Sequence, residues 1–340
     1  EVKGEQVVCP HCGYQDGTPY LPDYIAPGTM LRERYLIGVL LGHNGEGATY
    51  LAYDTVICCK VLIREYMPIG LCTRIKGKPI ISVNYNNLAQ YKALMAEYTE
   101  LNKTLARMRN LSHINPTLDL FAENNTTYTV FEYTEGVKLL DFLKDNAGEL
   151  SWNQAKKMFP PLFTTLSLVH NAGIVHRGIS PETIYVTEKG NLQLSAFCIS
   201  SVRTANTELK TELFPGYAAP EQYSASGRQG TWTDVYGICA VLYRILTGCM
   251  PTEAPSRLDN DNLCAPHELS GSIPVHVSRA IMDGLALNSD ERTQTITELV
   301  TRLFEETEEE TAQRTAVTPP PVPKYEPQPE PEYEDEEVYE

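Results

Sequence analysis

Apolar residues occur in two runs within residues 31–54, on either side of a turn that contains several glycines. Gly42, Gly45 and Gly47 mark this turn, and His, Asn and Glu stand between them. Two apolar runs joined by a glycine-rich turn are typical of a β-hairpin. The pattern therefore predicts two antiparallel strands near the start of the chain.

A helical spacing follows over residues 88–108. Apolar side chains recur there every three or four positions, at Leu94, Tyr98, Leu101, Leu105 and Met108. This spacing places them on one face of a helix that packs against a core. Further along, the apolar run at 236–248 is interrupted by Arg244. Because a membrane-spanning helix needs about 20 mostly apolar residues, we expect no membrane span.

The negative charge is concentrated at one end. The 340-residue chain carries a formal net charge of −16, yet residues 305–340 hold thirteen acidic and two basic side chains, which leaves −5 for the rest. This segment is rich in proline and poor in apolar residues, so we predict a disordered acidic tail. It is either a docking arm, with recognition sites at Tyr325, Tyr333 and Tyr339, or a spacer to a further domain. Nucleic acid is an unfavourable partner for so acidic a chain.

Residues 174–183 read I-V-H-R-G-I-S-P-E-T, and residues 195–198 read S-A-F-C. Together they resemble the catalytic loop and the metal-binding strand of a protein kinase. In the family pattern an Asp after His-Arg is the base, an Asn further along the loop binds Mg²⁺, and the Asp of Asp-Phe-Gly binds Mg²⁺ as well. Here these three positions hold Gly178, Thr183 and Ala196.

Phosphoryl transfer depends on positioning and on neutralising charge, so a chain without the base and both metal ligands lacks what this catalysis requires. The resemblance therefore implies a pseudokinase, which is a kinase fold without the activity. His176, Arg177 and Phe197 keep the family's identities. In the family the His and the Phe pack in the hydrophobic spine that joins the lobes, so we assign all three a structural role.

The resemblance extends from about Gly28 to Phe304. G-Y-A-A-P-E-Q-Y at 216–223 resembles the end of a kinase activation segment, and W-T-D-V-Y-G at 232–237 resembles the helix that anchors it. It implies that Glu221 pairs with Arg292 and that Asp234 ties the backbone of the catalytic loop. The implied fold is the α+β two-lobed kinase fold, with an antiparallel-sheet lobe and one main helix over 28–133, and a hinge and mostly helical lobe over 134–304.

The implied nucleotide site is altered as well. Val61-Leu62-Ile63-Arg64 aligns with the family's Val-Ala-Ile-Lys, so Arg64 replaces the phosphate-binding Lys and Leu62 replaces the small residue beside the adenine. An exchange of Lys for Arg is not conservative, because the planar guanidinium differs in shape from an ammonium. Phe131 narrows the back of the same pocket, next to the hinge residues Glu132 and Tyr133.

The glutamate that pairs with this Lys in the family falls on Leu101 here. Glu97 lies one helical turn before Leu101, and Glu100 is adjacent to it. Either glutamate could therefore reach Arg64 if the helix is rotated.

In the glycine-rich turn, Gly42 and Gly47 match family glycines, and Asn44 stands at the position of the second one. We interpret Glu46 as an exposed residue at the tip of this hairpin. With the metal ligands and the phosphate contacts altered, we expect that no cofactor is required. Binding of ATP without a metal is the alternative.

Cys9-Pro-His-Cys12 has the spacing of a zinc-ribbon knuckle, in which two thiolates hold one side of a tetrahedral metal. K-V-L-I-R-E-Y-M-P at 60–68 resembles bacterial serine/threonine kinases that carry an N-terminal zinc ribbon. We expect zinc only where a further ligand completes this half site in the extension 1–27. The other seven cysteines have no metal or disulfide spacing, which suits a reducing, cytoplasmic location.

We expect the chain to act as a non-catalytic scaffold or allosteric regulator in bacterial signalling. By analogy its partner would be an active kinase of the same system or a phosphopeptide-binding domain. Two alternatives stay open: a switch that binds ATP without Mg²⁺, and a weak serine/threonine kinase. Thr204, Thr207 and Thr211 lie where kinases carry regulatory phosphates, so they are either modification sites or ordinary loop threonines.

Overall fold

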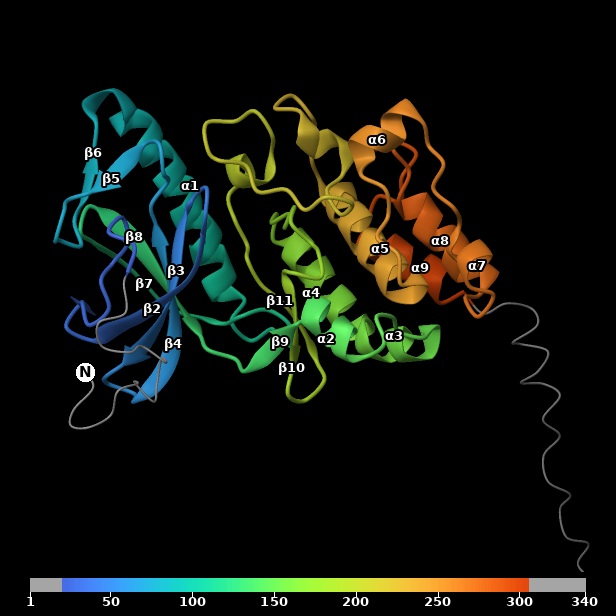
Figure 1. Ribbon diagram of the computed structural model, residues 1–340, viewed down its shortest axis with the longest axis horizontal. Coiled ribbons are helices and arrows are strands. Elements are labelled where there is room, and N and C mark those ends of the chain that lie inside the picture. The colour runs from blue at the N-terminus through green and yellow to red at the C-terminus, as the bar shows by residue number, and fades with distance from the viewer. Residues whose placement is uncertain (1–19, 306–340) are drawn as a thin grey trace, which may run out of the picture. The chain divides into compact units, whose positions relative to one another are not determined.

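The computed structural model describes residues 20–305 of the chain. These residues form a β-rich lobe and a helical lobe, which lie side by side in Figure 1. The predicted α+β two-lobed fold is confirmed. Cys9 and Cys12 of the predicted knuckle, and the acidic tail from residue 306 with its tyrosines, lie outside the described residues.

Six strands form the antiparallel sheet of the first lobe, in the order β1-β2-β3-β4-β8-β7. Their bounds are Met30–Leu31 for β1, Tyr35–Asn44 for β2, Gly47–Asp54 for β3, Cys59–Tyr66 for β4, Thr117–Glu123 for β7 and Thr126–Glu132 for β8. The hairpin predicted within residues 31–54 is confirmed as β2 and β3. These strands meet at the turn between Asn44 and Gly47.

Side chains link the two edges of this sheet. Arg32, just after β1, donates its backbone N–H to Glu123 of β7 at 3.0 Å and pairs with Asp119 of the same strand at 2.9 Å. The buried rings of Tyr35 and Phe121 stack on each other with their centroids 5.6 Å apart. Burial of such aromatic side chains supplies much of the apolar core of this lobe.

A small hairpin and the main helix of this lobe lie between β4 and β7 in the chain. A small hairpin consists of β5 (Cys72–Arg74) and β6 (Ile81–Val83). The helix predicted over 88–108 is confirmed as α1, Leu88–Arg107, and its buried face includes Leu94, Tyr98 and Leu105. Figure 1 shows α1 along the side of the sheet that faces the helical lobe.

The second lobe consists mainly of helices. Their bounds are Leu139–Asp145 for α2, Trp152–Met158 for α3, Pro160–Asn171 for α4, Thr231–Thr247 for α5, Ala254–Asp259 for α6, Pro266–Leu269 for α7, Val275–Gly284 for α8 and Ile296–Leu303 for α9. A small sheet of β9 (Gly136–Lys138), β10 (Ile184–Thr187) and β11 (Leu192–Leu194) lies beside them. Among residues 20–305, no helix has the length and apolar character to cross a membrane.

The apolar run at 236–248 forms the buried core helix of this lobe. All but four of the seventeen residues of α5 are buried, and α5 contributes to the largest apolar cluster. The helix ends at Gly248, whose φ of 71° is the left-handed conformation that favours glycine after a helix. Local sequence therefore ends this helix, and burial of its apolar side chains stabilises it.

Candidate functional site

The loop at residues 176–183 folds back on itself. The Thr183 hydroxyl donates to the Gly178 carbonyl at 2.7 Å and accepts the Ser180 N–H at 3.0 Å. Both hydrogen bonds stay within the loop, and Thr183 is buried. This hydroxyl therefore stabilises the loop, at a position where the family has a metal ligand.

Asp234 of α5 fixes the backbone at the start of this loop. Its carboxylate accepts the N–H groups of His176 and Arg177, each at 2.7 Å, and a hydrogen bond from His170 at 2.8 Å. Arg177 has a φ of 62°, which is unfavourable for a residue with a side chain. Burial works to raise the pKa of Asp234, but the hydrogen bond and charge of His170 lower it overall. The ionised carboxylate holds this turn in place.

His176 is buried against Phe197, with the rings edge to face and their centroids 4.5 Å apart. Its Nε2 donates to the Ser195 carbonyl at 2.7 Å, while Nδ1 accepts the Gly178 N–H at 3.1 Å. Burial lowers the pKa of His176 to about 4, so the ring is neutral at pH 7. The two hydrogen bonds place its proton on Nε2.

Glu221 and Arg292 form a buried ion pair, with 2.8 Å between Oε1 and Nη1. Glu221 also accepts the Thr233 hydroxyl at 2.8 Å, and Arg292 donates to the Ala286 carbonyl at 2.9 Å. The pair therefore connects the segment before α5 to the loop before α9. It holds the shape of the second lobe behind the cleft.

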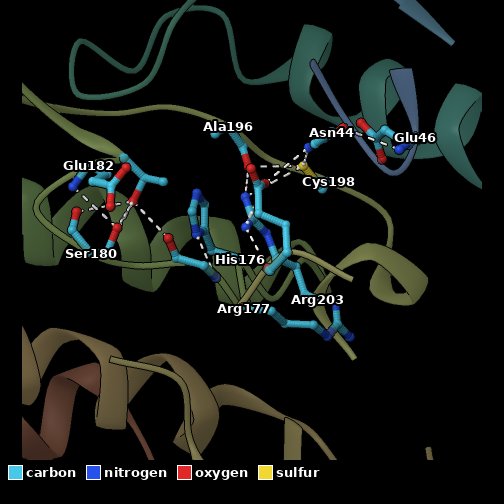
Figure 2. Close-up of polar contacts among 12 residues, drawn as sticks. Asn44, Glu46, His176, Arg177, Ser180, Glu182, Ala196, Cys198 and Arg203 are labelled. Atoms are coloured by element: carbon cyan, nitrogen blue, oxygen red, sulfur yellow. Dashed lines mark hydrogen bonds and ion pairs between the residues drawn. The ribbon is translucent and has the colours of Figure 1, made fainter. Parts of the chain in front are cut away.

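An arginine fills the space beside the residue at the base position. A Cβ added at Gly178 would lie 2.7 Å from both Cζ and Nε of Arg203, so any side chain there would collide with the guanidinium. Arg203 is fully buried and belongs to the segment after Cys198. Figure 2 shows its side chain extending toward Ala196, with Glu182 on the other side of His176.

Arg203 is held by several partners. Its Nη1 lies 2.9 Å from the Glu212 carboxylate, and Nη2 donates to the Ala196 carbonyl at 3.2 Å. The ring of Phe214 lies 4.9 Å from its Cζ, in a cation–π contact. The guanidinium therefore lies between Gly178 and Ala196, where the family has its base and a metal ligand. A fixed positive charge stands at that place.

The interpretation of Glu46 as an exposed hairpin tip is wrong. Its side chain is fully buried and pairs with Arg64, with 2.8 Å between Oε1 and Nε. Its Oε2 accepts the Ile199 N–H at 2.9 Å. Burial works to lower the pKa of Arg64, but the charge of Glu46 raises it overall. Glu46 turns inward because Arg64 and the Ile199 N–H supply the partners that a buried carboxylate needs.

Neither glutamate of α1 pairs with Arg64. Glu97 accepts the Ser200 hydroxyl at 3.1 Å, and Glu100 is exposed and pairs with a lysine of its own helix at 2.8 Å. Leu101, at the family's glutamate position, packs partly buried against the apolar clusters of both lobes. The partner of Arg64 therefore comes from the glycine-rich turn and not from the helix.

The glycine-rich turn is in contact with the segment after Cys198. A Cβ added at Gly45 would overlap with the Lys210 carbonyl, so this close approach requires glycine. A Cβ at Gly47 would overlap with the Glu65 carbonyl of β4, whereas Gly42 has open space around it. In the family, this turn covers the nucleotide phosphates. Here it packs against protein backbone.

Asn44 completes the contact between the lobes (Figure 2). Its Nδ2 lies 3.2 Å from Cys198 Sγ and 3.2 Å from the Glu212 carboxylate. Its Oδ1 accepts a hydrogen bond from Arg64 at 2.9 Å. Burial, and then the charge of Glu46, raise the pKa of Cys198, so its thiol stays protonated. These side chains form one connected polar network across the cleft.

Leu62 and Phe131 lie on the side of the cleft where the family binds adenine. Leu62 and Phe131 are direct partners across β4 and β8, and both are half-buried. Lys60 points toward the hinge, with its Nζ 5.4 Å from the centroid of the Tyr133 ring. Glu132 donates its backbone N–H to the Pro116 carbonyl at 2.9 Å, which fixes the start of the hinge.

These residues do not fit a complex of Mg²⁺ with a nucleotide. Within residues 20–305, no cluster of three His, Cys, Asp or Glu side chains is arranged to hold a metal ion. Gly178 and Ala196 carry no carboxylate, and the Arg203 guanidinium beside them would repel a cation.

The three threonines proposed as modification sites use their hydroxyls inside their own segment. Thr204 donates to the Ser200 carbonyl at 2.9 Å, Thr207 to the Ser201 carbonyl at 2.6 Å, and Thr211 to the Thr204 carbonyl at 3.0 Å. A phosphate on any of them would break one of these hydrogen bonds. Their modification remains a prediction.

Comparison with known proteins identifies the family. The model of the protein kinase domain matches residues 73–316, which is more than half of the chain. The chain belongs to the protein kinase family. A probable serine/threonine-protein kinase of Clostridium acetobutylicum is 26% identical over 80% of this chain and 40% of its own length. CBL-interacting serine/threonine-protein kinase 20 of Arabidopsis thaliana is 30% identical over 66% of this chain and 47% of its own.

A solved structure supports the fold. The chain described as the PpkA-294 apo form is 26% identical to this protein kinase family member, with a TM-score of 0.69. The match covers 83% of this chain and 99% of that one. This protein kinase family member spans less than half the length of the two curated relatives named above.

Sequence reasoning missed Arg203 and Glu212 in this member of the kinase family. Arg203 stands in an uncharged segment, I-S-S-V-R-T at 199–204, with no charged neighbour within several positions. A buried arginine needs a partner. That segment, together with Gly178 in place of the catalytic Asp, was the sequence signal that could have indicated a buried Arg203 beside the catalytic loop.

Proposed function

We propose that this protein kinase family member is a pseudokinase, which acts by binding another protein and does not transfer phosphate. The observation that carries the proposal is the position of the Arg203 guanidinium, 2.7 Å from where the Cβ of residue 178 would stand. A carboxylate base cannot be placed there without moving Arg203. Phosphoryl transfer to a hydroxyl needs such a base or an equivalent positioning group.

The charge balance of the cleft supports the same conclusion. Kinases neutralise the phosphates with Mg²⁺ and a lysine, and they hold Mg²⁺ with carboxylates. In this chain the cations Arg64 and Arg203 are paired with Glu46 and Glu212, at 2.8 and 2.9 Å. Charges that are already paired within the protein leave little attraction for a nucleotide.

The contacts between the lobes support a binding role. The buried Glu46 of the first lobe accepts the Ile199 N–H at 2.9 Å, and Asn44 contacts Glu212 at 3.2 Å. Such contacts hold the cleft closed and give the two lobes one fixed surface. A surface that is ordered before binding loses less entropy when a partner associates.

Calorimetric titration of the full chain with ATP, with and without Mg²⁺, tests the proposal. We expect no binding that depends on Mg²⁺ and no phosphate transfer to a generic protein substrate. Binding that is indifferent to Mg²⁺ would favour the nucleotide switch, and tight binding that requires Mg²⁺ would overturn the proposal.

Arg203→Ala is the matched variant for this titration, and Arg302→Ala, which removes an exposed arginine of α9, is its control. If nucleotide binding appears only in Arg203→Ala, the guanidinium is what closes the site, as proposed. If the two variants and the unmodified chain all bind Mg²⁺–ATP equally, Arg203 has no such role.

A further inference from the structure

The chain contains a single Asn-Gly pair, Asn44-Gly45, and this pair lies where the glycine-rich turn contacts the second lobe. Asn followed by Gly is the pair most prone to intramolecular deamidation, because glycine has no side chain to keep its own nitrogen away from the amide carbon of the asparagine. The products of that reaction are aspartate and isoaspartate. The contacts of Asn44 therefore bear on more than the packing of the cleft.

Two hydrogen-bond donors hold the amide oxygen of Asn44. Arg64 Nη2 donates to Oδ1 at 2.9 Å, and the Glu46 N–H donates to the same atom at 3.2 Å. Both donors draw electrons away from the amide carbon, Cγ. They also stand where they would stabilise the negative charge that forms on Oδ1 when a nucleophile attacks that carbon. The amide is thus activated toward attack.

The nucleophile is the nitrogen of Gly45. The bond from the Glu46 N–H closes a turn that folds the Asn44 side chain back toward the backbone that contains this nitrogen. Among the hydrogen bonds of the described residues, none has the Gly45 N–H as its donor, although Gly45 is buried. A nucleophile held close to its target and not engaged elsewhere reacts more readily.

The group that would leave is directed away from this nucleophile. Nδ2 of Asn44 lies 3.2 Å from the Glu212 carboxylate and 3.2 Å from Cys198 Sγ, and Figure 2 shows Asn44 facing Cys198. These two contacts and the two bonds to Oδ1 fix the orientation of the amide. Asn44 is half-buried, so water can reach the site.

We propose that Asn44 is a self-modification site whose product releases the glycine-rich turn from the second lobe. The Gly45 nitrogen bonds to Asn44 Cγ, and the bond from Cγ to Nδ2 breaks. The proton of the Gly45 N–H goes to the departing nitrogen, which leaves as ammonia, and a cyclic succinimide remains. One water molecule then opens the succinimide at either carbonyl and gives aspartate or isoaspartate.

The product changes the balance of charge between the lobes. Arg64 with Glu46 and Arg203 with Glu212 make two arginines and two carboxylates. Aspartate at position 44 adds a third carboxylate, where the amide now donates to Glu212 at 3.2 Å. Like charges at this distance repel each other. Isoaspartate would also lengthen the backbone next to the pairing of Asn44 with Gly47, which closes the hairpin of β2 and β3.

The reaction at Asn44 is independent of the proposed function, because it uses neither nucleotide nor Mg²⁺. A failed deamidation experiment would therefore leave the pseudokinase proposal unchanged. Binding of Mg²⁺–ATP would overturn the pseudokinase proposal without affecting the chemistry at Asn44.

Mass spectrometry of the full chain, incubated at neutral pH, tests the modification. Replacement of the amide by a carboxyl raises the mass of the peptide that contains Asn44, and fragmentation separates aspartate from isoaspartate. The reference is a synthetic peptide of residues 40–49, which has the same Asn-Gly pair without the fold. We expect conversion at least about tenfold faster in the folded chain. Equal or slower conversion in the folded chain would overturn the proposal.

Arg64→Lys tests the donor to the amide oxygen. Lysine keeps a positive charge beside Glu46 but lacks the planar fork that reaches both Glu46 and Asn44. We expect conversion to slow about tenfold. Thr49→Val is the matched control, because it removes another acceptor of Arg64, at 3.1 Å, without touching Asn44. Equal slowing in both variants would overturn the role of Arg64.

Asn44→Asp tests the consequence, since it reproduces one product directly. Hydrogen exchange of residues 199–212 should be faster in this variant than in the unmodified chain, because the contact with Glu212 becomes repulsive. Asn191→Asp adds the same charge at an exposed position in the turn between β10 and β11 and should leave this exchange unchanged. Unchanged exchange in Asn44→Asp, or equal acceleration in both variants, would overturn the release of the glycine-rich turn.

Discussion

The second lobe and the cleft both contain buried ionic groups, but these groups connect different parts of the molecule. Asp234 and the pair of Glu221 with Arg292 connect one backbone segment to another behind the cleft. In the cleft, Glu46 pairs with Arg64 and Glu212 with Arg203, across the space that a kinase gives to phosphates and metal. The first set maintains the fold. The second set joins charged side chains within the cleft.

The difference follows from the cost of burying charge. A charged side chain removed from water is costly unless a partner of opposite charge and hydrogen bonds accompany it. In the cleft, the charged side chains supply one another with such partners. Arg64 pairs with Glu46 and Arg203 with Glu212, as Arg292 pairs with Glu221 in the second lobe.

Breaking the pair behind the cleft should have the largest effect. Glu221→Ala leaves the fully buried Arg292 without its carboxylate, so we expect a loss of about 3–5 kcal/mol in the free energy of unfolding. Chemical denaturation measures it. Asp283→Ala, which removes one partner of an exposed pair, is the control and should cost less than about 1 kcal/mol.

The next effect concerns pH and His176. Its pKa falls from an ordinary value of 6.5 to about 4 in the folded protein, so the unfolded chain takes up the proton first as the pH falls. The stability from this group is fully present above pH 6.5 and is lost between pH 6.5 and 4, by roughly 3 kcal/mol.

Comparison of the unmodified chain with His176→Phe isolates the pH dependence of stability that His176 causes. The variant loses two hydrogen bonds and is less stable at neutral pH, but its stability should change less between pH 6.5 and 4. His43→Asn, an exposed histidine, should keep the original slope. Parallel curves for all three proteins would contradict a neutral, buried His176.

Breaking the cleft pair should have a smaller effect than breaking the pair behind it. In Glu46→Gln, Arg64 keeps its hydrogen bonds to Asn44 and Thr49, so we expect a loss of about 2 kcal/mol. Hydrogen exchange should show faster exchange of the Ile199 amide, whose acceptor is Glu46. Glu100→Gln is the exposed control, and an equal loss there would contradict the buried position of Glu46.

The smallest effect is a coupling between two positions. Gly178→Ala should destabilise the chain, because its methyl group would meet Arg203. Arg203→Ala removes this collision, so the double variant should be more stable than the sum of the single effects by about 1 kcal/mol. A double-mutant cycle from denaturation curves measures the coupling. Strict additivity would contradict the contact.

Several parts of the structure were predictable from the sequence because they depend on local pattern. The apolar spacing of Leu94, Tyr98 and Leu105 was sufficient for α1, and the glycine-rich turn for the hairpin of β2 and β3. The identities at 178, 183 and 196 showed that the family's two Asp side chains and its Asn are absent from these positions, since identity alone decides whether a carboxylate or an amide is present.

The tertiary structure alone decided which charged side chains lie beside positions 178 and 196 and in the rest of the cleft. Glu46 and Arg64 are eighteen positions apart, and Arg203 lies twenty-five positions beyond Gly178, so no local pattern brings them together. Glu46 read as an exposed turn residue because its sequence neighbours are polar, and it is buried because the turn folds onto the segment that contains Ile199. Local spacing determines helices and strands, but the partner of a buried charge is determined by which segments the packed lobes bring into contact.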